Sequence, residues 1–242
     1  MGKNITIKSK VIIVVSVIIA IITIAAIISS YNIFYKNIFA TSKLTQYRVA
    51  SFLSDIVYEE LRSRSLAVKS FVNSFNPNED RVKLSAVLEE FKSINGVLNV
   101  SLAYEDGEFT VDTASINSIS EDYDHKVRDW YIEGMKVADI YFSEPYQDTT
   151  TGEICLTLTY PIKKEGGVKG LMSVDFVLNV NQYLKNLPNE RLDGRLYVVH
   201  NSGIIASALN KEHLMKKFKH AQWLLVNHRN ITVSAALQGL VR

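Results

Sequence analysis

The chain has 242 residues, of which 47% are hydrophobic and 21% charged, and its formal net charge is +2. This length allows one or two domains beside a membrane segment. The basic residues form no single stripe, so the charge pattern does not predict nucleic-acid binding. With one cysteine, Cys155, the chain cannot form an intrachain disulfide.

The first 35 residues have the pattern of a membrane anchor. Three lysines and no acid precede residue 11, and no charged residue occurs from Val11 to Tyr35. As a helix, the apolar run Val11–Ile28 would extend over about 27 Å, close to the ~30 Å hydrocarbon core of a bilayer. A cleaved signal peptide is the alternative, but its apolar core would be only about 7–15 residues long. We expect a transmembrane helix over residues 11–30, with residues 1–10 in the cytoplasm because lysines favour that side.

A long helix is expected to follow the anchor over residues 31–76. Neither Pro nor Gly occurs from Ser42 to Phe75, and apolar residues recur there at helical spacing. Asn76-Pro77 is expected to end the helix, because the residue before a proline is disfavoured in helical conformation. Arg64 falls on the apolar stripe, and the sequence leaves its role open.

Residues 77–186 have the pattern of an α/β (α+β) module. One helix is expected between Asn78, which could cap it, and Asn95-Gly96, which would stop it. Short turns between consecutive strands predict an antiparallel sheet with helices to one side. The expected strands are residues 97–104, 109–113, 139–144, 154–160 and 168–177.

One stretch of nine residues, Tyr123–Tyr131, concentrates groups that suit a small zwitterion. Arg128 offers paired N–H donors for a carboxylate, and Trp130 offers an apolar wall with one donor. On a helix, Arg128 and Tyr131 would share a face. Residues 104–153 hold 13 acidic residues against three basic ones, and Arg128 is the only arginine among them. A ligand with a carboxylate and an ammonium group would find a partner for each end here. The alternative is a solvated helix whose aromatic side chains merely pack.

This stretch, with three later residues, resembles the amino-acid motif of double Cache (dCache) sensor domains in bacterial chemoreceptors, the methyl-accepting chemotaxis proteins. The resemblance covers roughly residues 10–207. It implies that separate residues hold the ligand carboxylate (Arg128 and Trp130), hold the amino group (Tyr123, Asp148 and Asp175) and line the pocket (Tyr131 and Tyr146). For Asp175, which has apolar neighbours, the residues alone leave a solvent-facing edge position as an alternative.

The resemblance also implies an architecture and a cellular setting. It implies PAS-like modules beside the long helix, with residues 77–186 as the membrane-distal ligand module. The protein would be a single-pass protein of the bacterial inner membrane, with its sensor domain periplasmic or extracellular and its long helix forming a homodimer. The ligand would be an L-amino acid, and an amine, an organic acid or another small metabolite is the alternative.

Residues 187–218 are expected to begin a second, membrane-proximal module. Residues 194–200 and 204–207 flank a turn and predict a hairpin, and Lys211–Phe218 could be the first helix of the module. Residues 210–242 contain six Lys or Arg against one acid, Glu212, and no further long apolar run. We therefore expect an atypical tail over residues 219–242, and a truncated, non-signalling receptor fragment is an alternative for the whole chain.

The sequence has no residue set typical of catalysis, of a metal or of a cofactor. It lacks a Gly-rich phosphate loop and the HExxH and GxSxG motifs. The serines of the loop 114–122 have no acyl-transfer motif around them. We expect a binding module rather than an enzyme. The histidines lack metal-ligand spacing and are expected at solvated positions: His125, His200, His213, His220 and His228.

Overall fold

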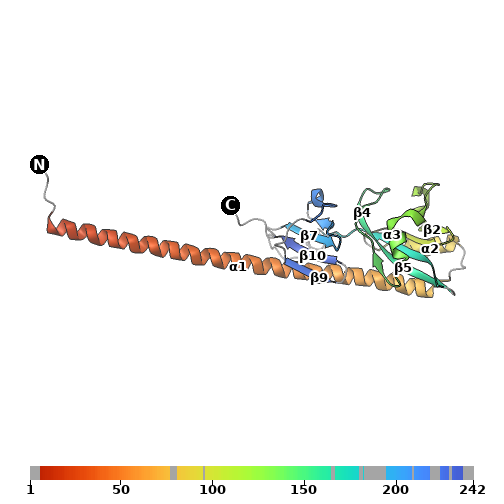
Figure 1. Ribbon diagram of the computed structural model, residues 1–242, viewed down its shortest axis with the longest axis horizontal. Helices are drawn as coiled ribbons and strands as arrows, with labels where there is room; N and C mark the ends of the chain where they lie inside the picture. The colour runs from red at the N-terminus through yellow and green to blue at the C-terminus, as the bar shows by residue number, and fades with distance from the viewer. Residues whose placement is uncertain are drawn as a thin grey trace. The chain divides into compact units, whose positions relative to one another are not determined.

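A computed structural model of the chain describes residues 6–76, 81–94, 96–164, 167–179, 182, 195–208, 210–218, 224–228 and 231–236 (Figure 1). The chain divides into two compact units, Met1–Gln46 and Tyr47–Arg242. The first unit consists of the N-terminal part of a long helix, and the second contains two antiparallel sheets.

The first element is one continuous α-helix, α1 (Ile7–Ser74), which is drawn from red to yellow in Figure 1. Its apolar N-terminal part has a mean hydropathy of 3.4 over 18 residues, none of them buried. The Thr23 hydroxyl donates to the carbonyl of Ile19, so this polar group is satisfied inside the helix. Among the described residues, α1 is the one helix long and apolar enough to cross a membrane. It ends just before Asn76-Pro77, as the sequence predicts.

In the second unit, the C-terminal part of α1 packs into a hydrophobic core through Ala50, Leu53 and Val57, each at most 2% exposed. Arg64 belongs to the same stripe and is 8% exposed. It forms an ion pair with Glu60, and its guanidinium carbon lies 5.0 Å from the centre of a phenylalanine ring of the sheet, Phe176. Pairing and ring contact explain how a cation fits on an apolar stripe.

A second helix, α2 (Arg81–Lys92), packs its buried Leu84 and Leu88 into the same core. The expected helix cap, Asn78, lies outside the described residues. Three short helices follow between residues 111 and 141: η1 (Ile116–Ser118), η2 (His125–Val127) and α3 (Asp129–Gly134).

The larger sheet has six antiparallel strands in the order β2-β1-β6-β5-β3, and β4 also pairs with β5. The predicted strands are confirmed, with the ends shifted by a few residues. Asp175 lies on the central strand β6, so the structure excludes an edge position for it. The strands are β1 (Val97–Tyr104), β2 (Phe109–Val111), β3 (Tyr141–Phe142), β4 (Tyr146–Gln147), β5 (Ile154–Lys164) and β6 (Gly167–Phe176).

The two faces of this sheet differ because side chains alternate along each strand. Val100, Leu102, Met172 and Val174 point into the core formed with α1 and α2. The residues between them point to the opposite face, and most of these are polar. In β6, Gly170 lies against the backbone of β1, where an added Cβ would collide with the carbonyl oxygen of Ala103.

The smaller sheet has four antiparallel strands in the order β8-β7-β10-β9. The predicted hairpin is confirmed as β7 and β8. Residues 219–242 were expected to be an atypical tail, but six residues of β10 pair with six of β7, which gives part of this segment a place in the sheet. The strands are β7 (Arg195–His200), β8 (Ile205–Ala208), β9 (Leu224–His228) and β10 (Ile231–Ala236).

The expected helix Lys211–Phe218 is not formed. Only one 3-10 turn, η3 (Lys211–His213), appears, and the Asn210 side chain accepts a hydrogen bond from the backbone N–H of Glu212 at its start. Met215 then takes a positive φ of 63°, which reverses the chain. Lys217 consequently bridges to Ile204, and this pairing with the hairpin replaces helical hydrogen bonds.

Candidate ligand-binding site

The polar face of the six-stranded sheet forms the floor of a cavity of about 990 Å³. Two pairs of opposed residues on the neighbouring strands β1 and β6 lie at this floor, Asn99 with Asp175 and Ser101 with Ser173. The walls come from residues 115–130 and 141–150. The same alternation that buries one face of the strands therefore supplies a polar floor on the other.

Asp175 is bonded at this floor by neutral groups. The Thr157 hydroxyl donates to Oδ1 at 2.7 Å, and the Asn99 amide donates to Oδ2 at 3.3 Å. Burial raises the pKa of Asp175 above its usual value, and these hydrogen bonds oppose the rise. The described residues provide no cation that pairs with this carboxylate. Its ionised form is therefore short of a positive partner.

Arg128 lies in the wall, immediately before α3. Its backbone is extended (φ −86°, ψ 137°), which corrects the expectation that it shares a helix face with Tyr131. The guanidinium carbon lies 5.2 Å from the centre of the Tyr123 ring, and the side chain is exposed. Burial raises the pKa of Tyr123, Arg128 opposes that rise and Asp175 adds to it, so both charges act on this phenol.

Tyr146 and Asp148 belong to the other wall segment, residues 141–150, and also line the cavity. The Tyr146 hydroxyl is 3.0 Å from Oγ1 of Thr157, which itself donates to Asp175. Burial raises the pKa of Tyr146, so this group stays a neutral phenol. Asp148 is 6% exposed, and its Oδ2 accepts hydrogen bonds from the backbone of Thr150 and from Thr151. One oxygen of the Asp148 carboxylate, Oδ2, therefore stabilises the turn that follows Asp148 in the chain.

Six of the seven predicted residues line the cavity, and Tyr131 does not. It is 6% exposed and packs with Trp130 over Ala103 and Leu171 of the sheet. Its ring meets that of His125 edge-on at 4.8 Å. Because the helix is short and starts at Asp129, residue 131 faces the sheet, where it supports Trp130 from below.

His125 was expected at a solvated position, but it is only 2% exposed. Its Nε2 lies 2.9 Å from the carbonyl oxygen of Tyr104, and its ring stacks on Phe109 at 5.2 Å. These contacts anchor the wall segment 115–130 to the hairpin of β1 and β2.

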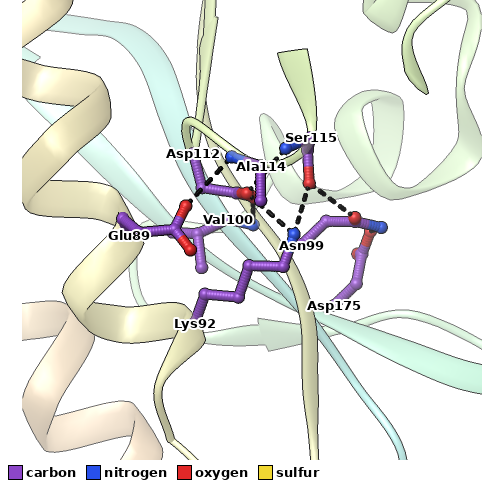
Figure 2. A network of polar contacts seen from close by, with 8 residues as sticks. All are labelled: Glu89, Lys92, Asn99, Val100, Asp112, Ala114, Ser115 and Asp175. Carbon is purple, nitrogen blue, oxygen red and sulfur yellow. Dashed lines mark hydrogen bonds and ion pairs between the residues drawn. The ribbon is translucent and has the colours of Figure 1, made fainter. Parts of the chain in front are cut away.

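Sequence reasoning missed a polar network beneath the cavity, shown in Figure 2. Lys92 points from α2 toward Asp112 and Ser115, with 2.8 Å from its Nζ to each side-chain oxygen. Ser115 donates to Asn99 at 3.0 Å, and Asn99 donates to Asp175. The hydrogen bonds therefore form a chain in which every donor points in the same direction, from Lys92 toward the carboxylate of Asp175. An acid directly after a short apolar strand was a possible signal for Asp112, but its partner is 20 residues away.

Cys155 pairs with Tyr146 across β5 and β4 and is fully buried. Burial and the Asp175 charge raise the pKa of its thiol to about 12. It belongs to the packing behind the cavity and not to its lining.

The described residues thus combine a long helix, an antiparallel sheet and a polar cavity. Residues 68–181 match the family model of the methyl-accepting chemotaxis protein-like first PDC sensor domain. This part of the chain is similar to that family, and the sequence relatives of the chain include methyl-accepting chemotaxis proteins. McpG of Pseudomonas putida is 26% identical over 141 residues, which are 58% of this chain and 22% of the relative. McpC of Bacillus subtilis is 24% identical over 236 residues, 92% of this chain and 35% of the relative. The chain thus spans between about a fifth and a third of the length of these relatives.

Solved structures share the fold at low sequence identity. The ligand-binding domain of Mlp24 with asparagine has a TM-score of 0.65 and 17% identity, covering 83% of this chain and 93% of that one. The ligand-binding domain of the Pseudomonas aeruginosa amino-acid chemoreceptor PctC, in complex with GABA, has a TM-score of 0.64 and 18% identity, covering 79% and 97%. The predicted α/β fold with a long N-terminal helix is confirmed.

Proposed function

We propose that this protein senses a free amino acid, which binds in the cavity above the six-stranded sheet. One observation carries the proposal: Asp175 is a half-buried carboxylate at the cavity floor with only neutral donors beside it, and Arg128 lines the same cavity. An ammonium group supplies the missing cation at Asp175, and a carboxylate supplies the partner for Arg128.

The other lining residues divide between these two ends. Trp130 joins Arg128 at the carboxylate end. Tyr123, whose pKa reflects both Arg128 and Asp175, joins Asp175 and Asp148 at the ammonium end. Tyr146 forms a hydrogen bond with Thr157, and its side chain is part of the cavity wall. The solved amino-acid chemoreceptor domains of this fold support the class of ligand.

The setting we propose is the inner membrane of a bacterium. The apolar part of α1 crosses the bilayer with the N-terminus in the cytoplasm, and the sensor unit lies on the outer side, paired with a second copy through α1. In this arrangement ligand binding shifts the equilibrium between two dimer geometries and so reports on chemotactic stimuli. This orientation can be tested by fusing a reporter that works only in the cytoplasm after Arg242. Activity of that reporter would overturn the orientation.

Calorimetric titration of the full chain in nanodiscs with a panel of L-amino acids and their decarboxylated amines tests the binding. We expect Arg128→Ala to weaken binding of the best amino acid by about 10- to 100-fold, since a hydrogen bond to a charged group contributes about 1.5–3 kcal/mol. Lys126→Ala is the matched control, because it removes the same charge two residues away and outside the lining. Equal affinities of wild type and Arg128→Ala, with both folded, would show that the cavity does not bind the carboxylate in this way.

A further inference from the structure

The charge on the cavity lining exceeds what a simple zwitterion needs. Among the described residues that line the cavity, seven are acidic and one, Arg128, is basic. A ligand with one carboxylate and one ammonium group uses Arg128 and Asp175. The remaining acids have no counterpart on such a ligand.

Most of these remaining acids are engaged within the protein. Asp122 accepts from the Ser120 hydroxyl, Asp124 from the backbone N–H of Lys126, and Asp148 from its own turn. Glu133 pairs with Lys136, with 2.6 Å between Oε1 and Nζ.

Asp129 and Glu144 differ from that set. Neither carboxylate accepts a hydrogen bond or forms an ion pair with a described residue, and both line the cavity. The charge of Glu144 acts on His200, which lies outside the lining, but burial is the larger influence and lowers the pKa of that imidazole, which keeps it neutral at pH 7.

The two free acids gather around one aromatic side chain. Tyr141 lines the cavity and is half-buried. Asp129 begins α3, which packs against β3, the strand that carries Tyr141, and Glu144 follows Tyr141 by three residues, so these side chains belong to the same part of the cavity lining. Burial raises the pKa of Tyr141, and the charges of Glu133, Glu144 and Asp129 raise it further. An aromatic ring bordered by carboxylates is a surface that suits an alkyl chain ending in a cation.

The size of the cavity agrees with a long ligand. Its volume of about 990 Å³ lies at the upper end of the roughly 300–1,000 Å³ of ligand pockets. Space therefore remains beyond the groups that hold the α-carboxylate and the α-ammonium.

We propose that Tyr141, Asp129 and Glu144 form a subsite for a cationic side chain, so that the preferred ligands are diamino monocarboxylates of the lysine, ornithine and arginine class. This inference rests on the proposed function, because it assigns the side-chain end of the same amino acid. Attraction between partly solvated charges is screened by salt, so the preference is largest at low ionic strength.

The sharpest test compares lysine with norleucine, which has the same side-chain length without the ammonium group. Calorimetry of the full chain in nanodiscs of neutral lipid is expected to show lysine binding at least about 10-fold more tightly, a difference of about 1.4 kcal/mol. The double variant Asp129→Asn/Glu144→Gln is expected to lose most of that difference while its affinity for norleucine stays unchanged. Glu121→Gln is the control, because Glu121 is exposed, lies next to the lining and is not part of it.

The outcomes separate the two proposals. If norleucine binds as tightly as lysine, or the double variant keeps the full preference, the subsite is overturned and the amino-acid proposal stands. If cadaverine, which lacks the carboxylate of lysine, binds as tightly as lysine, the subsite is supported and the amino-acid proposal fails. If neither lysine nor norleucine binds but another L-amino acid does, only the subsite is overturned, and if no L-amino acid of the panel binds, both proposals fail.

Discussion

Asp112 and Asp175 lie beside the same sheet, but only Asp112 has a cation beside it. Asp112 is completely buried, and it accepts from Lys92 and from the backbone N–H groups of Val100 and Ser115. Asp175 has two neutral donors and one side toward the cavity. The same network joins the two regions, because Ser115 and Asn99 lie between them (Figure 2).

This difference distinguishes a structural carboxylate from one available to a ligand. A buried charge is costly unless it is paired and hydrogen-bonded. At Asp112 the protein meets that cost with its own lysine, so the site is complete without a ligand. At Asp175 the compensating charge is absent from the described residues, and burial raises the pKa of the carboxyl instead.

The largest effect is expected from removing the Asp112 carboxylate, which is paired within the protein. Asp112→Ala removes the charge partner of Lys92 and the side-chain acceptor of the Val100 N–H, and breaking such a buried pair costs roughly 3–5 kcal/mol. Urea unfolding of the variant measures the loss. Asp106→Ala, in the exposed turn after β1, serves as control and should change stability by less than about 1 kcal/mol. A loss at Asp112 no larger than at Asp106 would show that the two regions do not differ as described.

Removing the charge at the open site should have opposite effects on binding and on stability. Because burial raises the pKa of Asp175, the ionised form is disfavoured in the folded state, and Asp175→Asn should stabilise the ligand-free domain. About 1 kcal/mol would raise the melting temperature by roughly 2–4 °C. Loss of a charge partner for the ligand ammonium should cost roughly 2–5 kcal/mol of affinity. Calorimetry and thermal unfolding of the same sample check both, and a variant that melts lower yet binds normally contradicts the assignment.

The pH dependence of binding sharpens the contrast further. The raised pKa of Asp175 means that its carboxylate takes up a proton at a pH above its ordinary value of 3.8. Amino-acid affinity should therefore fall as the pH drops through this raised pKa. Without ligand, the destabilising contribution of Asp175 is present above the folded pKa and disappears below the unfolded one. Binding titrations from pH 7 downward test this dependence. The substitution Asp175→Asn should abolish the part of the pH dependence that is due to Asp175.

A smaller effect is expected from the residue between the two regions. Asn99→Ala removes one hydrogen bond to Asp175 and one from Ser115, each contributing about 0.5–1.5 kcal/mol. We expect unfolding free energy to fall by about 1–2 kcal/mol and ligand affinity by less than 10-fold. Ser118→Ala, in the cavity wall but outside the network, is the control. Measuring both quantities shows whether the network supports the carboxylate from below.

The sequence predicted most of the larger sheet, because turn signals such as Asn95-Gly96 before β1 and Asp106-Gly107 after it mark the limits of its strands. It also singled out six of the residues that line the cavity, since aromatic residues and a lone arginine stand out in an acidic segment. It did not predict contacts that depend on the packing of distant elements. The Lys92–Asp112 pair, the burial of His125 and the inward position of Tyr131 are all of this kind.

The C-terminal segment was harder to interpret for a related reason. Its strands β9 and β10 follow a basic, weakly patterned stretch, and β10 finds its partner in β7, more than 30 residues earlier in the chain. Pairing across that separation leaves no local pattern. At Lys211–Phe218 the bridge between Ile204 and Lys217 replaced the expected helix.

The burial of Cys155 has a practical chemical consequence. With a pKa near 12 and no solvent-accessible surface, its thiol is almost entirely protonated at neutral pH and shielded from alkylating reagents. The native chain thus behaves toward a maleimide dye as though it had no cysteine. A spectroscopic label can therefore be attached to a single cysteine introduced on the cavity rim, with the packing behind Tyr146 left as it is.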